Sequence, residues 1–336
     1  MGKRLKSYYF SGICWIFSFL LFSQVQKLYR KTENSNIRLS SPYLCHYNVS
    51  TFGGGSERDV IFLYGTGYKY GLELTIRSIR SAGCKCRIVF IYPSSFHPEG
   101  EFKDILKSLK VECIETPEED PLQRIDVPHM IRYEYEKIWL DNHINEVDRV
   151  LHTDSYDVFF QGCPFAQSID NNPIPFDSLI FVVEPHCFRS CGWNLAWMES
   201  CYGHEITISH RHNFIICSGS IAGGAKPYQK LLNLLIEQPQ WESCWNISLD
   251  QPILNHLMWT GKIKEAGINY QLTGCNGGFF TMQWCIVERD VQFNEKGQII
   301  SLEGSVPSFI HQYNRIYGLE TNFWRACHMN IPGLYD

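Results

Sequence analysis

The chain has 336 residues and a mass of 39.1 kDa, which is enough to bury one large hydrophobic core or two small ones. Hydrophobic residues make up 44% of the sequence and the formal net charge is −5 at pH 7, a balance typical of a globular protein. The charge excludes the positive excess of a general nucleic-acid binder, and we expect no nucleic-acid partner.

The first thirty residues differ from the rest. Lys3, Arg4 and Lys6 precede an uncharged apolar run, residues 8 to 25, which is close to the shortest segment that spans a bilayer. The run predicts a membrane-spanning signal anchor after a short cytosolic tail, residues 1 to 7; a cleaved signal peptide is the alternative. Basic residues flank both ends of the run, so they do not decide its orientation.

Cysteine usage indicates the compartment. All but one of the 14 cysteines follow the apolar run, and none forms the paired C-x-x-C clusters of a zinc site. Such a number favours disulfides in an oxidising lumen. The sequons Asn48-Val49-Ser50 and Asn246-Ile247-Ser248 fit the same compartment. We therefore expect a single-pass type II protein of the ER or Golgi membrane with a lumenal body and at least one unpaired thiol.

A polar segment follows the anchor. Residues 26 to 57 contain the run Gly53-Gly54-Gly55-Ser56, which predicts a flexible stem before a catalytic domain over residues 58 to 336. Cys45 offers a disulfide that would tie this stem to the domain.

Apolar runs and helical periodicity alternate from residue 59 onward. We expect strands at 59–64, 87–92 and 111–114, with helices at 72–80 and 101–109 between them. This alternation predicts a parallel sheet with right-handed crossovers. A helix at 130–143 then leads to another apolar strand, which begins at Arg149.

The second half is less regular. It predicts strands at 178–183 and 213–216, helices at 228–237 and 250–259, a hairpin within 291–301 and a last strand at 307–310. The segment from Cys187 to Cys201 suggests a disulfide-pinned insertion. The expected fold class is therefore α/β, a Rossmann-type, mostly parallel sheet flanked by helices, with a less regular C-terminal region.

Two carboxylates, Asp154 and Asp157, follow the strand that begins at Arg149. The end of a buried strand is where an open α/β sheet places a ligand, and carboxylate oxygens can hold a divalent cation there. Residues three apart point to opposite faces of a continuous strand, so both can reach one metal only if the chain turns after Asp154. The alternative is that one carboxylate caps a helix or pairs with a lysine.

The stretch Asp154-Ser155-Tyr156-Asp157-Val158-Phe159-Phe160-Gln161 resembles the acidic-motif region of glycosyltransferases with the GT-A fold. It is most similar to a poorly described group in which the strand reads Thr-Asp-x-x-Asp-Val-x-Phe-Gln, and more distantly similar to the glycogenin-like retaining enzymes. Three further stretches follow in the expected order, and the similarity covers residues 59 to 315. They are Cys217-Ser218-Gly219-Ser220, Leu249-Asp250-Gln251 and Ile310-His311-Gln312.

The resemblance implies a metal-dependent transfer of a sugar from a nucleotide-sugar, with a UDP-sugar the expected donor, to a glycan, protein or lipid acceptor. Mn²⁺ or Mg²⁺ would be held by Asp154, Asp157 and His311, and Asp154 would also contact the donor. The spacing of the two aspartates is one residue longer than the usual Asp-x-Asp, which leaves open which of them binds the metal directly. Whether the anomeric configuration is retained also stays open.

Other positions follow from the resemblance. It implies a catalytic role for Asp250 and Gln251 and acceptor contacts for the segment Ser218, Gly219 and Ser220. Asp250 also begins a predicted helix, so it could serve as the N-cap, a role that is compatible with the catalytic one. Cys217 stands where the relatives have Asn. Five tryptophans could line an acceptor groove or pack in the core: Trp193, Trp197, Trp241, Trp245 and Trp259.

The nucleotide itself would lie near the first strand. The loop Tyr64-Gly65-Thr66-Gly67 follows that strand, where a nucleoside binds in an open sheet, and Tyr64 offers a ring for stacking on uracil. An ordinary turn is the alternative. Arg132 and Lys137 are candidates for contact with the sugar or the diphosphate; solvated helix charges are the alternative for both.

Two other functions fit parts of the pattern. A lumenal glycan-binding protein could keep the fold without activity. A hydrolase could use Asp154 and Asp157 as an acid and base pair, although their spacing disfavours the opposed carboxylates that glycosidases need.

Overall fold

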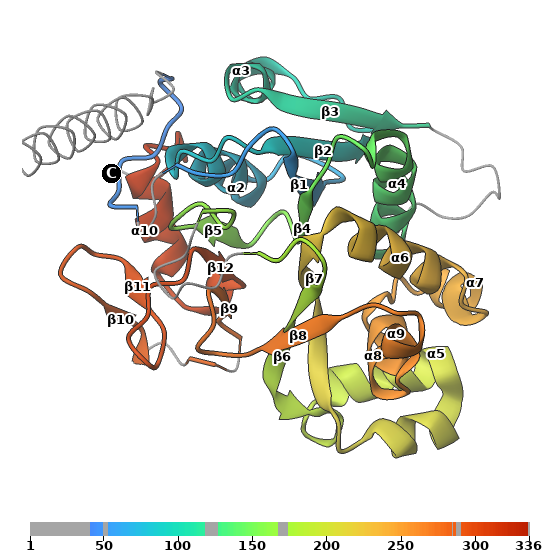
Figure 1. Cartoon of the computed structure of the whole chain (residues 1–336). Coiled ribbons are helices and arrows are strands. Elements are labelled where there is room, and N and C mark those ends of the chain that lie inside the picture. The colour runs from blue at the N-terminus through green and yellow to red at the C-terminus, as the bar shows by residue number, and fades with distance from the viewer. Residues whose placement is uncertain are drawn as a thin grey trace, which may run out of the picture. The chain divides into compact units, whose positions relative to one another are not determined.

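Seven strands form one sheet in the order β3-β2-β1-β4-β7-β6-β8 (Figure 1). They are β1 (Asp59–Tyr64), β2 (Arg87–Pro93), β3 (Val111–Thr116), β4 (Arg149–Thr153), β6 (Leu179–Cys187), β7 (Phe214–Gly224) and β8 (Tyr270–Thr273). Six of them run in one direction, and β7 is antiparallel to its neighbours β4 and β6. The computed structural model describes residues 41–49, 53–117, 127–166, 174–283, 285–286 and 290–334. The predicted α/β class, with a mostly parallel sheet flanked by helices, is confirmed.

Helices cover one face of this sheet (Figure 1). They are α4 (Pro128–His143), α6 (Ala225–Ile236), α7 (Gln240–Trp245), α8 (Gln251–Trp259) and α9 (Lys262–Glu265). Alternate residues of β1 point into this layer, and the ring of Phe62 lies 5.3 Å from that of Trp139 on α4. Trp241 and Trp245 are fully buried in the same cluster, so they are packing residues and do not line a groove.

The opposite face packs on α2 (Tyr70–Ser81), α3 (Gly100–Ser108) and a small sheet in the order β5-β12-β9. The small strands are β5 (Val158–Phe160), β12 (Phe309–His311) and β9 (Phe279–Thr281). Because side chains alternate along a strand, Phe160 faces the large sheet whereas Phe159 packs toward helix α10 (Leu319–Ala326). The small sheet therefore lies between the large sheet and α10, and it carries His311 at the end of its central strand.

The middle of the chain differs from expectation. Residues 187 to 201 are not a disulfide-pinned insertion: Cys187 is free, and Cys201 pairs with Cys244 of α7. Most of this segment belongs to α5 (Gly192–His210), which is kinked at Gly203, where φ is 76°. The strand expected at 213–216 continues to Gly224, because pairing with β4 and β6 on both sides satisfies the backbone of a small-residue segment with weak strand propensity.

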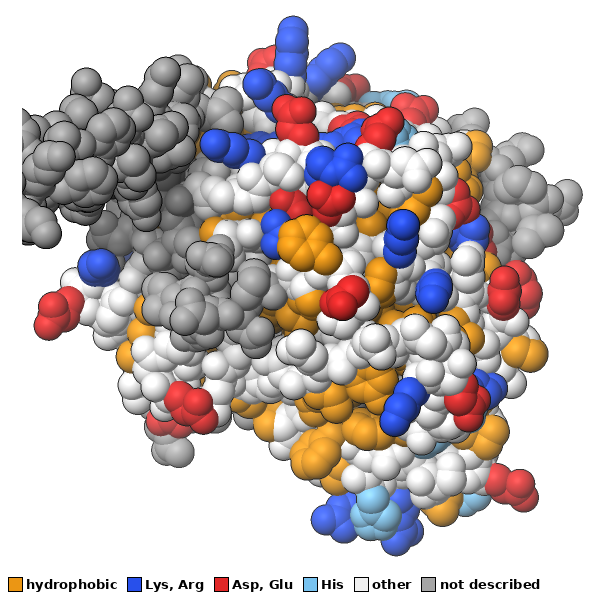
Figure 2. Space-filling model, viewed as in Figure 1, with side chains coloured by type: hydrophobic (Ala, Val, Ile, Leu, Met, Phe, Trp, Pro, Cys, Tyr) orange, Lys and Arg blue, Asp and Glu red, His pale blue; other side chains and the backbone are white. Residues whose placement is uncertain are grey.

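The predicted C-terminal hairpin is present as β10 (Gln292–Phe293) and β11 (Ile299–Ile300), which pair antiparallel. Basic and acidic side chains are interspersed over the upper described surface of the face in Figure 2, and apolar side chains gather lower on it. The described part of this face therefore carries no continuous basic field.

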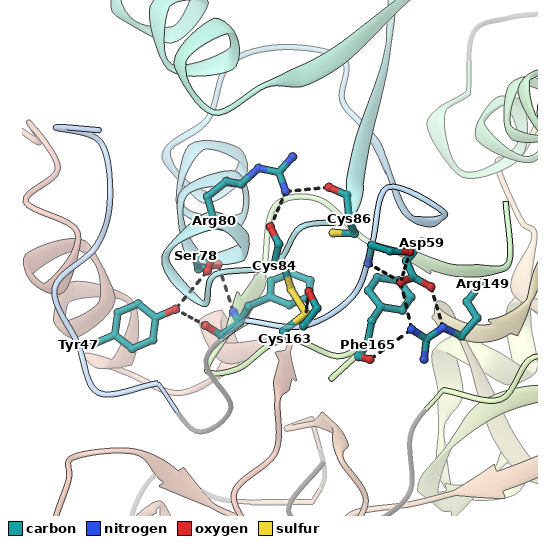
Figure 3. The surroundings of a disulfide bond; sticks show 12 residues. Tyr47, Asp59, Ser78, Arg80, Cys84, Cys86, Arg149, Cys163 and Phe165 are labelled. Carbon is teal, nitrogen blue, oxygen red and sulfur yellow. Dashed lines mark hydrogen bonds and ion pairs between the residues drawn. A yellow bond between two sulfur atoms is a disulfide. The ribbon is translucent and has the colours of Figure 1, made fainter. Parts of the chain in front are cut away.

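The described residues contain four disulfides, three between distant segments and one, Cys275–Cys285, within a local loop. The pairs are Cys45–Cys327, Cys84–Cys163, Cys201–Cys244 and Cys275–Cys285. Figure 3 shows Cys84–Cys163, which links the turn after α2 to the segment after β5. The disulfides predicted from the cysteine number are therefore present.

The folded unit begins at Ser41, ahead of the boundary predicted at residue 58. Cys45 is bonded to Cys327 after α10, and the backbone N–H of His46 donates to the carbonyl of Ala326 at 2.6 Å. The C-terminal part of the predicted stem is thus packed on the body. The predicted tail and anchor, residues 1 to 25, lie outside the described residues. Within the described part of the chain, no helix has both the length and the apolar character that crossing a bilayer requires.

A buried ion pair joins the first residues of β1 and β4. Asp59 and Arg149 are directly opposite in the parallel register, and two guanidinium N–H groups donate to the two carboxylate oxygens at 2.7 and 3.0 Å (Figure 3). Arg149 also donates to the carbonyl of Phe165. Since both charged groups are buried, each depends on the other for its charge compensation.

We expect the Arg149→Ala change to lower the free energy of unfolding by about 3–5 kcal/mol, because it leaves the buried carboxylate of Asp59 without its partner. Chemical denaturation of the oxidised protein measures this loss. Arg58→Ala is the matched control, since Arg58 pairs with Asp148 on the exposed surface nearby and its loss should leave the midpoint almost unchanged. Equal effects of the two changes would contradict the assignment.

Candidate metal centre and pocket

Asp154, Asp157 and His311 come together at the end of β4. One candidate ligand atom from each residue lies within 4.8 Å of the other two. His311 Nε2 is 3.1 Å from Asp154 Oδ2 and 3.6 Å from Asp157 Oδ1. Residues 157 apart in sequence meet here because β12 pairs antiparallel with β5, which places His311 opposite Val158. The possible metal site predicted from the sequence is therefore present as a cluster of two carboxylates and one imidazole.

The chain turns immediately after β4, as shared ligation by the two aspartates requires. The hydroxyl of Ser155 accepts the backbone N–H of Tyr64 at 2.8 Å. The phenol of Tyr156 accepts from the N–H of Thr66 and donates to the carbonyl of Gly67. These bonds fasten the acidic turn to the loop after β1 and hold both carboxylates on one side.

Ser220 on β7 determines which nitrogen of His311 faces the carboxylates. Its hydroxyl donates to the carbonyl of Gly219 at 2.8 Å, so its lone pair is free to accept the Nδ1–H of His311 at 3.1 Å. This places the Nε2 lone pair toward two carboxylates. A bare lone pair would repel them, so the arrangement favours a shared cation, either a proton or a metal ion.

The pKa values of the three groups report the same coupling. Burial acts to raise the pKa of Asp154, but Arg132 and His311 hold it well below its ordinary value. Burial, reinforced by Asp154 and opposed by His311, raises the pKa of Asp157. Burial acts to lower the pKa of His311, but the sulfur of Cys217 and the carboxylate of Asp154 raise it well above its ordinary value.

Arg132 on α4 joins the Asp154–Asp157–His311 cluster to α8. Its two terminal nitrogens donate to Asp154 Oδ1 at 2.6 Å and to Asp250 Oδ2 at 2.8 Å. Tyr133 also donates to Asp250, at 3.0 Å. Asp250 occupies the N-cap position of α8, yet its side chain makes no cap hydrogen bond there. Its carboxylate is directed to Arg132, so the side chain does not make the predicted cap hydrogen bond.

A pocket of about 880 Å³ opens beside the cluster, within the range of small-molecule sites. Tyr64 at the end of β1 and Asp154 after β4 both line it. The chain continues from β1 to β2 on one side and reaches β4 on the other, so the pocket lies at the point where the strand order reverses. Open α/β sheets bind ligands at this position, outside the carboxyl ends of the strands.

The structure uses the segment after Cys217 in three ways. Ser218 donates its N–H to Gln251 Oε1 at 3.0 Å, which fastens β7 to α8. A Cβ at Gly219 would lie 2.4 Å from Asp154 Oδ2, so the absence of a side chain makes room for that carboxylate. Ser220 orients His311. Gln251 also donates to Asn194 of α5 and lines the pocket.

The residues predicted for nucleotide contact are divided between the pocket and its surroundings. Tyr64 and Arg132 line the pocket. Gly65 and Thr66 lie behind it, against Tyr156, and support the wall. Lys137 lies one helical turn further along α4 and pairs with Asp141; it is not among the residues that line the pocket.

Two charged pocket residues escaped the sequence analysis. Glu184 lies in β6 and is buried, and burial raises its pKa to about 7. Glu184 directly follows the predicted apolar strand 178–183, just as Asp154 follows the strand that begins at Arg149, so the same pattern could have identified it. Arg315 follows His311 by four residues, lines the pocket and acts electrostatically on Asp157.

No known protein family matches the chain, and a comparison with curated proteins finds no match either.

We expect the Gly219→Ala change to weaken Mn²⁺ binding about 10- to 100-fold, because the new methyl group would displace the carboxylate of Asp154. Titration calorimetry with MnCl₂ measures the affinity. Gly278→Ala is the control, since a Cβ there meets no atom within 4 Å. Unchanged Mn²⁺ affinity in a folded Gly219→Ala protein would exclude Asp154 as a ligand.

Proposed function

We propose that the protein is a metal-dependent glycosyltransferase that moves a sugar from a nucleotide-sugar, a UDP-sugar in the first instance, to an acceptor. The observation that carries the proposal is the Asp154–Asp157–His311 cluster at the strand-order reversal of an α/β sheet, beside a pocket of nucleotide-sugar size that both aspartates line. The resemblance in sequence, which orders the same residues along the chain, supports it.

The donor set suits Mn²⁺ or Mg²⁺. Carboxylate oxygens are preferred by both hard cations, and an imidazole nitrogen is acceptable to Mn²⁺. Asp154, Asp157 and His311 would hold the ion, and Ser220 would act as the outer partner that orients the imidazole. When bound, the ion supplies Lewis-acid stabilisation of the negative charge on a departing diphosphate.

The chain's own residues have distinct tasks in this proposal. Tyr64 and Tyr156 form the wall where the nucleoside would rest. Arg132 donates to one carboxylate from each of its terminal nitrogens, and its buried Nε has no hydrogen-bond partner among the described residues. That N–H is left for an oxygen of the donor. Arg315 is exposed at the pocket rim and offers a full guanidinium to the diphosphate.

Asp250 would lie beside the transferred sugar. Its carboxylate is buried and held by Arg132 and Tyr133, so its position is fixed before substrate binds. A fixed negative charge stabilises the positive charge that develops at an anomeric carbon during glycosyl transfer.

The finer fold assignment is part of the same proposal. A mostly parallel sheet with one antiparallel strand, followed by a small sheet that contributes a late histidine, supports a GT-A-like fold with a C-terminal acceptor region. The four disulfides support a lumenal setting, in the ER or Golgi, for the catalytic body.

A donor screen tests the function. The full chain is incubated with each common nucleotide-sugar, with and without Mn²⁺, and slow release of the nucleoside diphosphate is followed. We expect release from one UDP-sugar that depends on Mn²⁺. No turnover of any donor, combined with intact glycan binding, would instead favour an inactive glycan-binding protein.

Asp154→Asn and His311→Ala should each reduce Mn²⁺-dependent UDP affinity by more than about 100-fold, because each removes a metal ligand. Calorimetry with UDP and MnCl₂ provides the measurement, and circular dichroism verifies folding. Asp141→Asn is the matched control, since Asp141 lies on the exposed side of α4 and pairs with Lys137. Retained affinity in both site variants would make the cluster structural.

Arg315→Ala should weaken UDP binding roughly 10-fold, the loss of one charge-assisted hydrogen bond to a phosphate. Lys137→Ala should leave the affinity unchanged, because that ammonium lies away from the pocket. Isothermal titration calorimetry with UDP at constant Mn²⁺ shows whether Arg315 or Lys137 contacts the diphosphate. The opposite order of effects would restore Lys137 as the diphosphate contact.

A further inference from the structure

We propose that the part of the pocket between β6 and α5 binds a glycan acceptor, with the attacking hydroxyl on the carboxylate of Glu184 and a sugar ring against the indole of Trp193. This inference rests on the proposed glycosyltransferase function and names the class of its second substrate.

Glu184 is a buried acid, and the basic side chains that act on it are two histidines, His186 and His311. Its side chain is 6% exposed and lines the pocket, and no lysine or arginine forms an ion pair with it within the described ranges. His186 Nε2 is 3.4 Å from Glu184 Oε2, but burial lowers the pKa of His186 and so favours its neutral form. A buried carboxyl group needs a hydrogen-bond partner, and a ligand hydroxyl in the pocket would supply one. In the transfer, the acceptor oxygen would bond to the anomeric carbon while the bond from that carbon to the nucleoside diphosphate breaks, the diphosphate would leave, and the hydroxyl proton would pass to Glu184. The raised pKa of about 7 agrees with such a proton exchange near neutral pH.

Trp193 presents a large apolar ring to the same space. It lies in the first turn of α5 and lines the pocket, although 75% of its surface is exposed. Trp197, one turn further along α5, also lines the pocket and is half-buried. An exposed tryptophan at the edge of a pocket offers contact area at small entropic cost, because its ring has few rotatable bonds.

Helix α5, which carries both tryptophans, is bonded to two neighbouring helices. Asn194 accepts a hydrogen bond from Gln251 of α8 at 2.7 Å, and Cys201 is bonded to Cys244 of α7. The aromatic surface therefore stays at a fixed distance from Asp250, which begins α8. Fixed placement of this kind is what a substrate-orienting surface requires.

The pairing of an acid with an aromatic ring selects among acceptor classes. A pyranose combines hydroxyl groups around its edge with an apolar face of C–H bonds, so it can bond Glu184 and stack on Trp193 at once. A serine or threonine of a peptide would use the carboxylate but has no flat apolar face. A long-chain alcohol would need a continuous apolar channel, whereas Asn194, Gln251 and Ser218 line this part of the pocket.

The test uses the full chain with Mn²⁺ and the UDP-sugar that the donor screen identifies. The probes are p-nitrophenyl glycosides of common pyranoses, a serine- and threonine-containing peptide, and a long-chain alcohol. We expect at least one glycoside, and neither other probe, to increase diphosphate release above the rate of donor hydrolysis. Stimulation by the peptide or the alcohol alone, or by no probe while hydrolysis proceeds, would overturn the inference and leave the proposed function standing.

Variants locate the site. Trp193→Ala should raise the KM for the stimulating glycoside roughly 2- to 10-fold and leave UDP affinity unchanged, the expected loss of one aromatic contact. Phe293→Ala is the matched control, because Phe293 is a half-exposed aromatic on β10 outside the pocket. Glu184→Gln should lower transfer to the glycoside more than donor hydrolysis. An unchanged KM in Trp193→Ala, or an equal rise in Phe293→Ala, would place the acceptor elsewhere.

Discussion

The pocket contains more carboxylates than guanidinium groups, and this imbalance is the constraint on which the site depends. Asp154, Asp157, Asp250 and Glu184 line it, opposed by Arg132 and Arg315 among the residues described. Arg132 is buried and neutralises part of two carboxylates. Buried charges without compensation destabilise a fold by several kcal/mol, so an excess of acids is tolerated where a proton or a cation completes the balance. His311 Nε2 faces both Asp154 and Asp157, so the negative charge that the arginines leave uncompensated lies around this nitrogen.

Most of the sheet could be predicted from the sequence because buried strands of an α/β fold are short apolar runs separated by helical periodicity. The runs at Val60 and Ile88 are clear examples, and both are completely buried. The small sheet was harder. The strand around Phe279 is three residues long, and its residues become a strand only by pairing with β12 and extending a surface built elsewhere in the sequence.

The candidate site was likewise predictable only in part from the sequence. Asp154, Asp157 and His311 were predicted as partners from type and order, and the structure brings them together. The role of Gly219 could not be predicted, because it depends on the distance between two segments that only the folded β4 and β7 define. Disulfide partners likewise depend on tertiary placement: Cys201 was matched with its sequence neighbour Cys187 but bonds Cys244 across a helix packing contact.

The geometry also separates the proposed chemistry from glycoside hydrolysis. Glycosidases need two carboxyl groups on opposite sides of the sugar, one as an acid and the other as a base or nucleophile. Here Asp154 and Asp157 converge on one imidazole nitrogen, with all three candidate ligand atoms within 4.8 Å. Two acids that share one neighbour cannot enclose a sugar ring between them. The four-residue turn after β4 therefore supports ligation of a single cation.

The disulfide between Cys45 and Cys327 has a consequence for how the protein folds during its synthesis on the ribosome. The two cysteines are 282 residues apart, and His311 precedes the second by only sixteen positions in the printed sequence. A chain released early could still build the first strands and close Cys84–Cys163, since proteins fold progressively as they emerge. It would lack both the imidazole of His311 and the disulfide between Cys45 and Cys327. The cluster of two carboxylates and one imidazole can thus form only after His311 has been synthesised, and chains truncated before it would carry the acidic turn without that imidazole.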